Sequence, residues 1–150
     1  MADKYTFTLD DGSREYAFVN KFGEPIGTMH FRGGDISILE RYNSLLTDFD
    51  KIVAPLSEVS MKDDGTSSVE ADWEKIKEVE KALIERINAI FDSHDAENLF
   101  KNRNAFSTIN GSFYVEKVIE ALGNVVAQEM SEEQTKAKKR LEKYTKDIGK

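Results

Sequence analysis

The sequence predicts an α+β fold, in which an N-terminal three-stranded antiparallel β-meander packs on a bundle of three long helices and a helical C-terminal tail follows. Apolar residues alternate with polar ones in the first thirty residues, which is the period of half-buried strands. In three later stretches they recur every three or four residues, which is the period of amphipathic helices. A chain of 150 residues is long enough for one hydrophobic core. We therefore expect a single domain over residues 1–130 and a charged helical tail over residues 131–150.

Three strands are expected at the N-terminus. A polar turn that contains Gly12 separates the first strand from the second, and a break that contains Gly23 and Pro25 separates the second from the third. The strands are predicted over residues 5–9, 16–19 and 27–31. Because a three-stranded meander is only marginally stable alone, its apolar face should rest on the helices.

Three amphipathic helices are expected after the strands, at about residues 35–56, 67–91 and 112–130. Asp35 is suited to cap the first helix, because its carboxylate can accept hydrogen bonds from free amides of the first turn. The polar residues 57–68 between the first two helices are typical of an exposed loop. Ser131 begins a capping-box pattern, so the third helix either restarts or bends there.

The sequence contains no pattern typical of an enzyme or a metal site. It has no cysteine, and His30 and His94 lie in different elements without metal-ligand spacing. Neighbouring carboxylates such as Asp48 and Asp50 are expected by chance among 28 acidic residues. We therefore predict a protein that is not an enzyme, with no catalytic residues, no metal ligands and no cofactor. No apolar run approaches the roughly 20 residues that a membrane span requires, so no membrane association is expected.

Charge is distributed unevenly along the chain. Residues 131–150 contain seven basic and four acidic side chains, a net charge of +3, so the first 130 residues carry −10 of the total of −7. The net negative charge of residues 1–130 argues against general binding of nucleic acid, which needs clustered basic residues. The tail instead suits helix-in-groove binding of a protein partner or self-association. A small nucleic-acid-associated regulator that uses the tail stays open as the alternative.

Two surfaces are candidates for binding a protein. One is the apolar stripe of the tail, formed by Leu141, Tyr144 and Ile148. The other is the turn at Leu99 and Phe100 together with Arg103 in the following polar loop. Ordinary packing is the competing interpretation of both.

Several short motifs, taken together, resemble a known family over about residues 16–130. A meander ends in a Gly-Thr-Met-His-Phe-Arg segment, an Asp precedes a helix with an early Arg, a second helix closes in Ile-Phe-Asp, and a Leu-Phe step leads to an Asn-containing loop. These motifs are Gly27 to Arg32, Asp35, Arg41, Ile90 to Asp92, Leu99 with Phe100, and Asn102 to Asn104. They are similar to the tail assembly chaperone-like proteins of phages and prophages of Gram-positive bacteria. The resemblance implies a protein in the cytoplasm of the bacterial host that binds the hydrophobic tape-measure protein, without catalytic residues.

Overall fold

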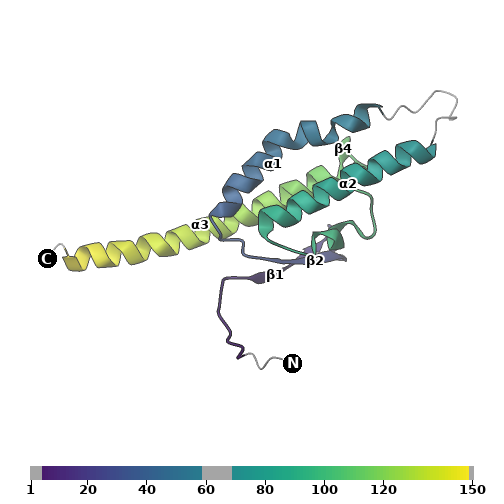
Figure 1. Cartoon of the computed structure of the whole chain (residues 1–150). Coiled ribbons are helices and arrows are strands. Elements are labelled where there is room, and N and C mark those ends of the chain that lie inside the picture. The colour runs from purple at the N-terminus through teal and green to yellow at the C-terminus, as the bar shows by residue number, and fades with distance from the viewer. Residues whose placement is uncertain (1–4, 59–68, 149–150) are drawn as a thin grey trace.

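The computed structural model describes residues 5–58 and 69–148, of which residues 57–58, 69–72 and 144–148 are described by their backbone alone. The predicted α+β class is confirmed, with three α-helices and two small antiparallel sheets among the described residues (Figure 1). The elements in chain order are β1 (Arg14–Val19), β2 (Pro25–Phe31), α1 (Ser37–Val53), the 3₁₀ helix η1 (Ala54–Glu58), α2 (Val69–Phe91), the 3₁₀ helix η2 (Ala96–Phe100), β3 (Thr108–Ile109), β4 (Ser112–Phe113) and α3 (Tyr114–Ile148).

The predicted three-stranded meander is wrong, because the first sheet contains only β1 and β2. Residues 5–13 form no strand, and the side chains of Tyr5, Phe7 and Leu9 are 85–88% exposed. Alternation makes this segment suitable for a strand, but a strand also needs a neighbour whose backbone groups pair with its own. In Figure 1 the segment leads away from the sheet instead of folding back along β1.

The hairpin of β1 and β2 is attached to the helices through aromatic side chains. Tyr16 lies opposite Met29 in the β1–β2 register, and its ring stacks on that of Phe31 at a centroid distance of 4.2 Å. The Phe31 ring in turn lies 4.6 Å from the ring of Phe91, the last residue of α2. Because Met29 and Phe31 are buried, β2 is the strand that closes the core.

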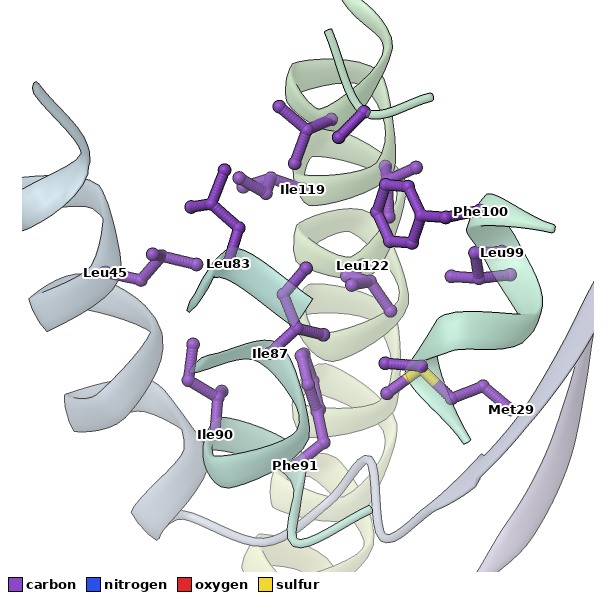
Figure 2. Close-up of a cluster of buried hydrophobic side chains, with 14 of the residues drawn as sticks. Met29, Leu45, Leu83, Ile87, Ile90, Phe91, Leu99, Phe100, Ile119 and Leu122 are labelled. Atoms are coloured by element: carbon purple, nitrogen blue, oxygen red, sulfur yellow. The ribbon is translucent and has the colours of Figure 1, made fainter. Parts of the chain in front are cut away.

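The core lies between the three helices, β2 and η2. Figure 2 shows side chains from α1, α2 and α3 meeting Met29 of β2 and Leu99 and Phe100 of η2. The labelled members are Met29, Leu45, Leu83, Ile87, Ile90, Phe91, Leu99, Phe100, Ile119 and Leu122. Each helix supplies one stripe at three- and four-residue spacing, as the sequence predicts.

The helix ends differ in places from those expected. The first helix ends as an α-helix at Val53 and continues as the 3₁₀ helix η1. The Asp35 carboxylate accepts a hydrogen bond from the Ser37 amide at 3.0 Å, although Asp35 lies one residue before the N-cap position. The loop predicted over residues 57–68 falls mostly on residues 59–68, which lie outside the described part of the chain.

Helix α3 is continuous through the predicted restart at Ser131. The Ser131 carbonyl accepts a hydrogen bond from the Thr135 hydroxyl at 2.8 Å inside the helix, so the Ser-Glu-Glu-Gln sequence does not begin a new helix. Side chains of residues 131–143 are all exposed, and α3 extends well beyond the other helices in Figure 1. None of the helices that the structure describes is long and apolar enough to pass through a lipid bilayer.

A second small hairpin, not predicted from the sequence, precedes α3. Its two-residue turn places Asn110 at φ 51° and Gly111 at φ 86°, both in the left-handed region. An Asn-Gly pair suits such a turn because both residues tolerate positive φ.

Candidate functional site

A surface hollow with an apolar floor lies between α1 and α3. It has a volume of about 380 Å³. We call it the α1–α3 groove. Its lining residues are Tyr42, Leu46, Phe49 and Asp50 from α1, and Glu116, Ile119 and Glu120 from α3.

The floor of the groove forms because α1 carries an apolar residue beside the stripe that faces the core. Ile38 and Leu45 face the core and are buried, which leaves the consecutive Leu46 on the flank of the helix with half of its side chain exposed. Phe49 lies one turn further along and is half-buried. These two side chains and the buried Ile119 therefore form an apolar strip that is open to solvent on one side.

A glycine sets the close approach of the two helices at the groove. The Tyr42 hydroxyl donates a 2.9 Å hydrogen bond to the Ile119 carbonyl of α3. A Cβ on Gly123 would overlap the Tyr42 hydroxyl oxygen and would lie 3.0 Å from its Cζ atom. Only glycine thus allows the Tyr42 ring to lie against α3 in this position.

The rim of the groove is acidic. Asp50, Glu116 and Glu120 are all exposed at its edges. The Glu116 carboxylate accepts a 2.7 Å hydrogen bond from the Phe113 amide, which fixes it at the start of α3. Burial raises the pKa of Tyr42, and the negative charge of Glu120 raises it further. An apolar floor with an acidic rim is complementary to an amphipathic segment that has basic flanks.

A polar cluster lies on another face, where β2 meets the segment between α2 and η2. The His30 Nδ1 atom lies 2.7 Å from the Asp95 carboxylate, and the Ser93 hydroxyl donates to the same carboxylate at 2.7 Å. The hydrogen bond to Asp95 raises the pKa of His30. Burial raises the pKa of Asp95, but the hydrogen bonds from His30 and Ser93 outweigh it and the net shift is downward.

The order of these three groups differs from that of an activated serine. A serine nucleophile needs its hydroxyl on the histidine, with the carboxylate behind the imidazole. Here the carboxylate of Asp95 lies between the serine and the histidine and accepts from both. It also accepts from the backbone amide of His30, so the cluster ties β2 to the start of η2.

Two arginines hold the C-terminal end of α2. Arg41 donates from Nε to the Ile90 carbonyl at 2.8 Å, and Arg32 donates to the Asp92 carboxylate at 2.8 Å. Cations at this position satisfy free carbonyls and oppose the negative end of the helix dipole. Arg32, Arg41 and Asp92 belong to the motifs that carry the family resemblance, and each has a structural partner at this end of α2.

The residues of the two binding surfaces predicted from the sequence lie in different environments in the structure. Leu99 and Phe100 are 3% and 8% exposed and pack in the core, so packing accounts for both. Arg103 is exposed, with its guanidinium 5.6 Å from the Tyr114 ring centroid. In the tail, Leu141 is 65% exposed, whereas the side chains of Tyr144 and Ile148 lie outside the described residues.

Sequence reasoning missed the α1–α3 groove, although one signal for it was present. Leu45 and Leu46 are adjacent, and on a helix adjacent side chains are about 100° apart, so only one of them can face the core fully. An extra apolar residue beside a complete stripe therefore marks a candidate surface.

Within residues 5–58 and 69–148, no three histidine, aspartate or glutamate side chains are grouped so that they could hold a metal ion.

No protein-family model matches the chain, and no curated protein and no solved structure matches it.

Proposed function

We propose that this chain binds an amphipathic helix of a protein partner in the α1–α3 groove. The observation that supports the proposal most directly is the combination of a half-exposed Leu46 and the neighbouring Phe49 with three carboxylates on the rim. Such a groove buries apolar side chains spaced by three or four residues and orients the incoming helix by its basic flanks.

The resemblance of the sequence motifs to phage and prophage tail assembly chaperone-like proteins supplies the biological context of the proposal. In that role the chain acts in the cytoplasm of the bacterial host and covers the apolar stripe of the tape-measure protein before tail assembly. A soluble protein that covers an apolar patch prevents its aggregation. No chemical step is required, and no residue is assigned to catalysis.

Co-expression with a tape-measure protein encoded beside this chain tests the function. We expect the two proteins to purify together, and the tape-measure protein to be more soluble in the presence of the chain. If the native chain neither purifies with the tape-measure protein nor raises its solubility, the proposed role in tail assembly is excluded.

Two matched variants test the groove within the same experiment. Leu46→Glu places a charge on the apolar floor and should abolish co-purification, because a buried unpaired carboxylate costs several kcal/mol. Leu141→Glu makes the same change at an exposed position of the tail and should leave co-purification intact. Loss of binding in the second variant alone would assign the partner to the tail stripe instead of the groove. Circular dichroism of both variants checks that they stay folded.

One observation favours a second candidate function, that of a small nucleic-acid-associated regulator. The basic side chains of residues 136–143 are all exposed on the projecting part of α3. Charge reversal at Lys138 and Lys139 should then weaken binding to short duplex DNA or RNA and reduce the salt dependence of the affinity. Equal binding by the native chain and this variant would exclude the tail as a nucleic-acid surface.

A further inference from the structure

We propose that the N-terminal arm, residues 5–9, adds as a third strand to the sheet of a second copy of this chain, so that two copies exchange arms reciprocally. The proposal concerns a different face from the α1–α3 groove and does not depend on the function proposed for the groove.

The arm carries an apolar face that no other described residue of the same copy covers. Tyr5, Phe7 and Leu9 alternate with threonines, and their side chains are 88%, 86% and 85% exposed. Three side chains of this size present roughly 500 Å² of apolar surface, about the largest patch that a soluble monomer ordinarily exposes. An extended segment with this alternation is suited to pairing with a strand.

The sheet has one open edge that can receive the arm. Among the described residues, β1 pairs only with β2. The other edge of β2 is occupied, because the Asn98 side chain donates to the Thr28 carbonyl at 3.1 Å and the His30 amide donates to the Asp95 carboxylate. A third strand can therefore add only beside β1.

The turn before β1 carries its own arm away from this edge. The Gly12 amide donates to the Asp10 carboxylate at 3.0 Å, and the Ser13 amide donates to the Asp11 carboxylate at 2.9 Å. Gly12 has φ 83°, which other residues rarely adopt. With these contacts in place the arm projects from the molecule, as Figure 1 shows, and is accessible to another copy.

The side-chain pattern fixes how the arm would pair. Tyr16 and Phe18 are half-buried and face the helices, whereas Ala17 and Val19 are exposed on the opposite face. An antiparallel register that places Phe7 opposite Tyr16 also places Tyr5 opposite Phe18, so all four rings lie on the buried face. A shift by one residue would turn the threonines toward that face, so the apolar pattern excludes it, and the register with Phe7 opposite Tyr16 sets both rings of the arm against both rings of β1.

The area is sufficient for a stable dimer. Each arm would remove roughly 500 Å² of its own apolar surface from water and cover a comparable area of the partner. Reciprocal exchange therefore buries roughly 2,000 Å² in total, which falls in the range of stable protein interfaces. Reciprocal exchange would also pair the free backbone N–H and C=O groups on the open edge of β1 in both copies.

Sedimentation equilibrium of the full chain measures the oligomeric state. We expect a dimer for the native chain and a monomer for Phe7→Asp, because the charge would enter the buried face of the sheet. Phe22→Asp is the matched control, since Phe22 is 75% exposed in the β1–β2 turn and should leave the dimer intact. A native chain that is monomeric at all measured concentrations, or a Phe7→Asp variant that stays dimeric, would overturn the proposal.

Cysteine cross-linking then separates exchange from folding back within one chain. In the proposed register Thr8 lies opposite Glu15 on the solvent-facing side, and the native chain contains no cysteine. Oxidation of a mixture of Thr8→Cys and Glu15→Cys single variants should yield disulfide-linked heterodimers on a non-reducing gel. If these do not form, while the Thr8→Cys, Glu15→Cys double variant closes a disulfide within one chain, the arm folds back on its own sheet and the proposal is refuted.

Discussion

Gly123 is the residue whose replacement most directly tests how α1 and α3 approach each other. In an exposed helix, Gly→Ala would stabilise the fold by about 1 kcal/mol through helix propensity. At this position the new Cβ would overlap the Tyr42 hydroxyl, which donates to the Ile119 carbonyl. Overpacking costs about 1–3 kcal/mol, and loss of the hydrogen bond adds about 1 kcal/mol. The sum predicts that Gly123→Ala lowers the free energy of unfolding by about 1–3 kcal/mol.

A double-mutant cycle with Tyr42→Phe isolates the clash. Tyr42→Phe alone removes one hydrogen bond and should cost about 1 kcal/mol. It also removes the atom nearest to the new Cβ, leaving Cζ at 3.0 Å, which a small movement of the ring can relieve. The double variant should therefore be more stable than the sum of the two single effects by about 1–2 kcal/mol.

Urea denaturation followed by circular dichroism measures all four proteins of the cycle. The neighbouring Asn124→Ala is the control, because Asn124 is exposed on α3 and its replacement changes helix propensity alone. A destabilisation of 2 kcal/mol should also lower Tm by about 4–8 °C in a domain of this size. Strict additivity of Gly123→Ala and Tyr42→Phe, or a Gly123→Ala variant as stable as the Asn124→Ala control, would refute the inferred close contact.

Four further predictions concern single residues. The Tyr16 hydroxyl oxygen is buried without a hydrogen-bond partner among the described residues, so Tyr16→Phe should leave stability unchanged or raise it. The Tyr114 hydroxyl donates to a backbone carbonyl of η2 at 2.6 Å, so Tyr114→Phe should lower the free energy of unfolding by about 0.5–1.5 kcal/mol in the same urea assay. Equal effects of Tyr16→Phe and Tyr114→Phe on stability would contradict the hydrogen-bonding state assigned to each hydroxyl. Because the hydrogen bond to Asp95 raises the pKa of His30 above 6.5, protonated His30 stabilises the fold below that value, and this contribution is lost as the pH rises through the raised pKa of the folded state. The stability difference between the native chain and His30→Asn should accordingly be largest below pH 6.5 and shrink as the pH rises above it, and a constant difference would disprove the coupling. Gly111 has φ 86°, so Gly111→Ala should cost about 1–2 kcal/mol, measured as a lower midpoint of urea unfolding.

The helices were predictable because each carries its own signal. The stripe of α2 has no glycine or proline to interrupt it, and its predicted end at Phe91 is the observed one. The 3₁₀ geometry after Val53 was not predictable, since periodicity does not distinguish a tightened last turn from a continuing α-helix. The expected break at Ser131 failed for a related reason, because a capping sequence can also be accommodated inside a helix that has already formed.

The β3–β4 hairpin shows a local signal that was present and overlooked. Asn110 and Gly111 form the dipeptide most typical of a two-residue hairpin turn, flanked by the apolar Ile109 and Phe113. Strands of two residues have too little alternation to be detected by period, so the turn is their only sequence mark.

The candidate site depended on contacts between distant parts of the chain, which periodicity does not report. The pairing of Tyr42 with Gly123 across two helices decides where the groove lies, and neither residue is unusual in its own segment. The same reasoning explains why the sequence predicts a candidate surface at Leu99 and Phe100: a short apolar step in a polar loop has the same sequence whether it faces a partner or the core. Burial distinguishes the two, and burial is a property of the whole fold.

The failure of the predicted first strand differs from the other errors. The alternation of Tyr5, Phe7 and Leu9 specifies a segment that pairs on one apolar face, and the open edge of β1 offers a matching face in Tyr16 and Phe18. A sequence pattern fixes the preferred conformation of a strand but not the chain from which its neighbour comes. The alternation and the exposed arm are consistent with each other if the neighbour belongs to a second copy. The prediction was then wrong about the fold of one chain because it assumed that every strand pairs within it.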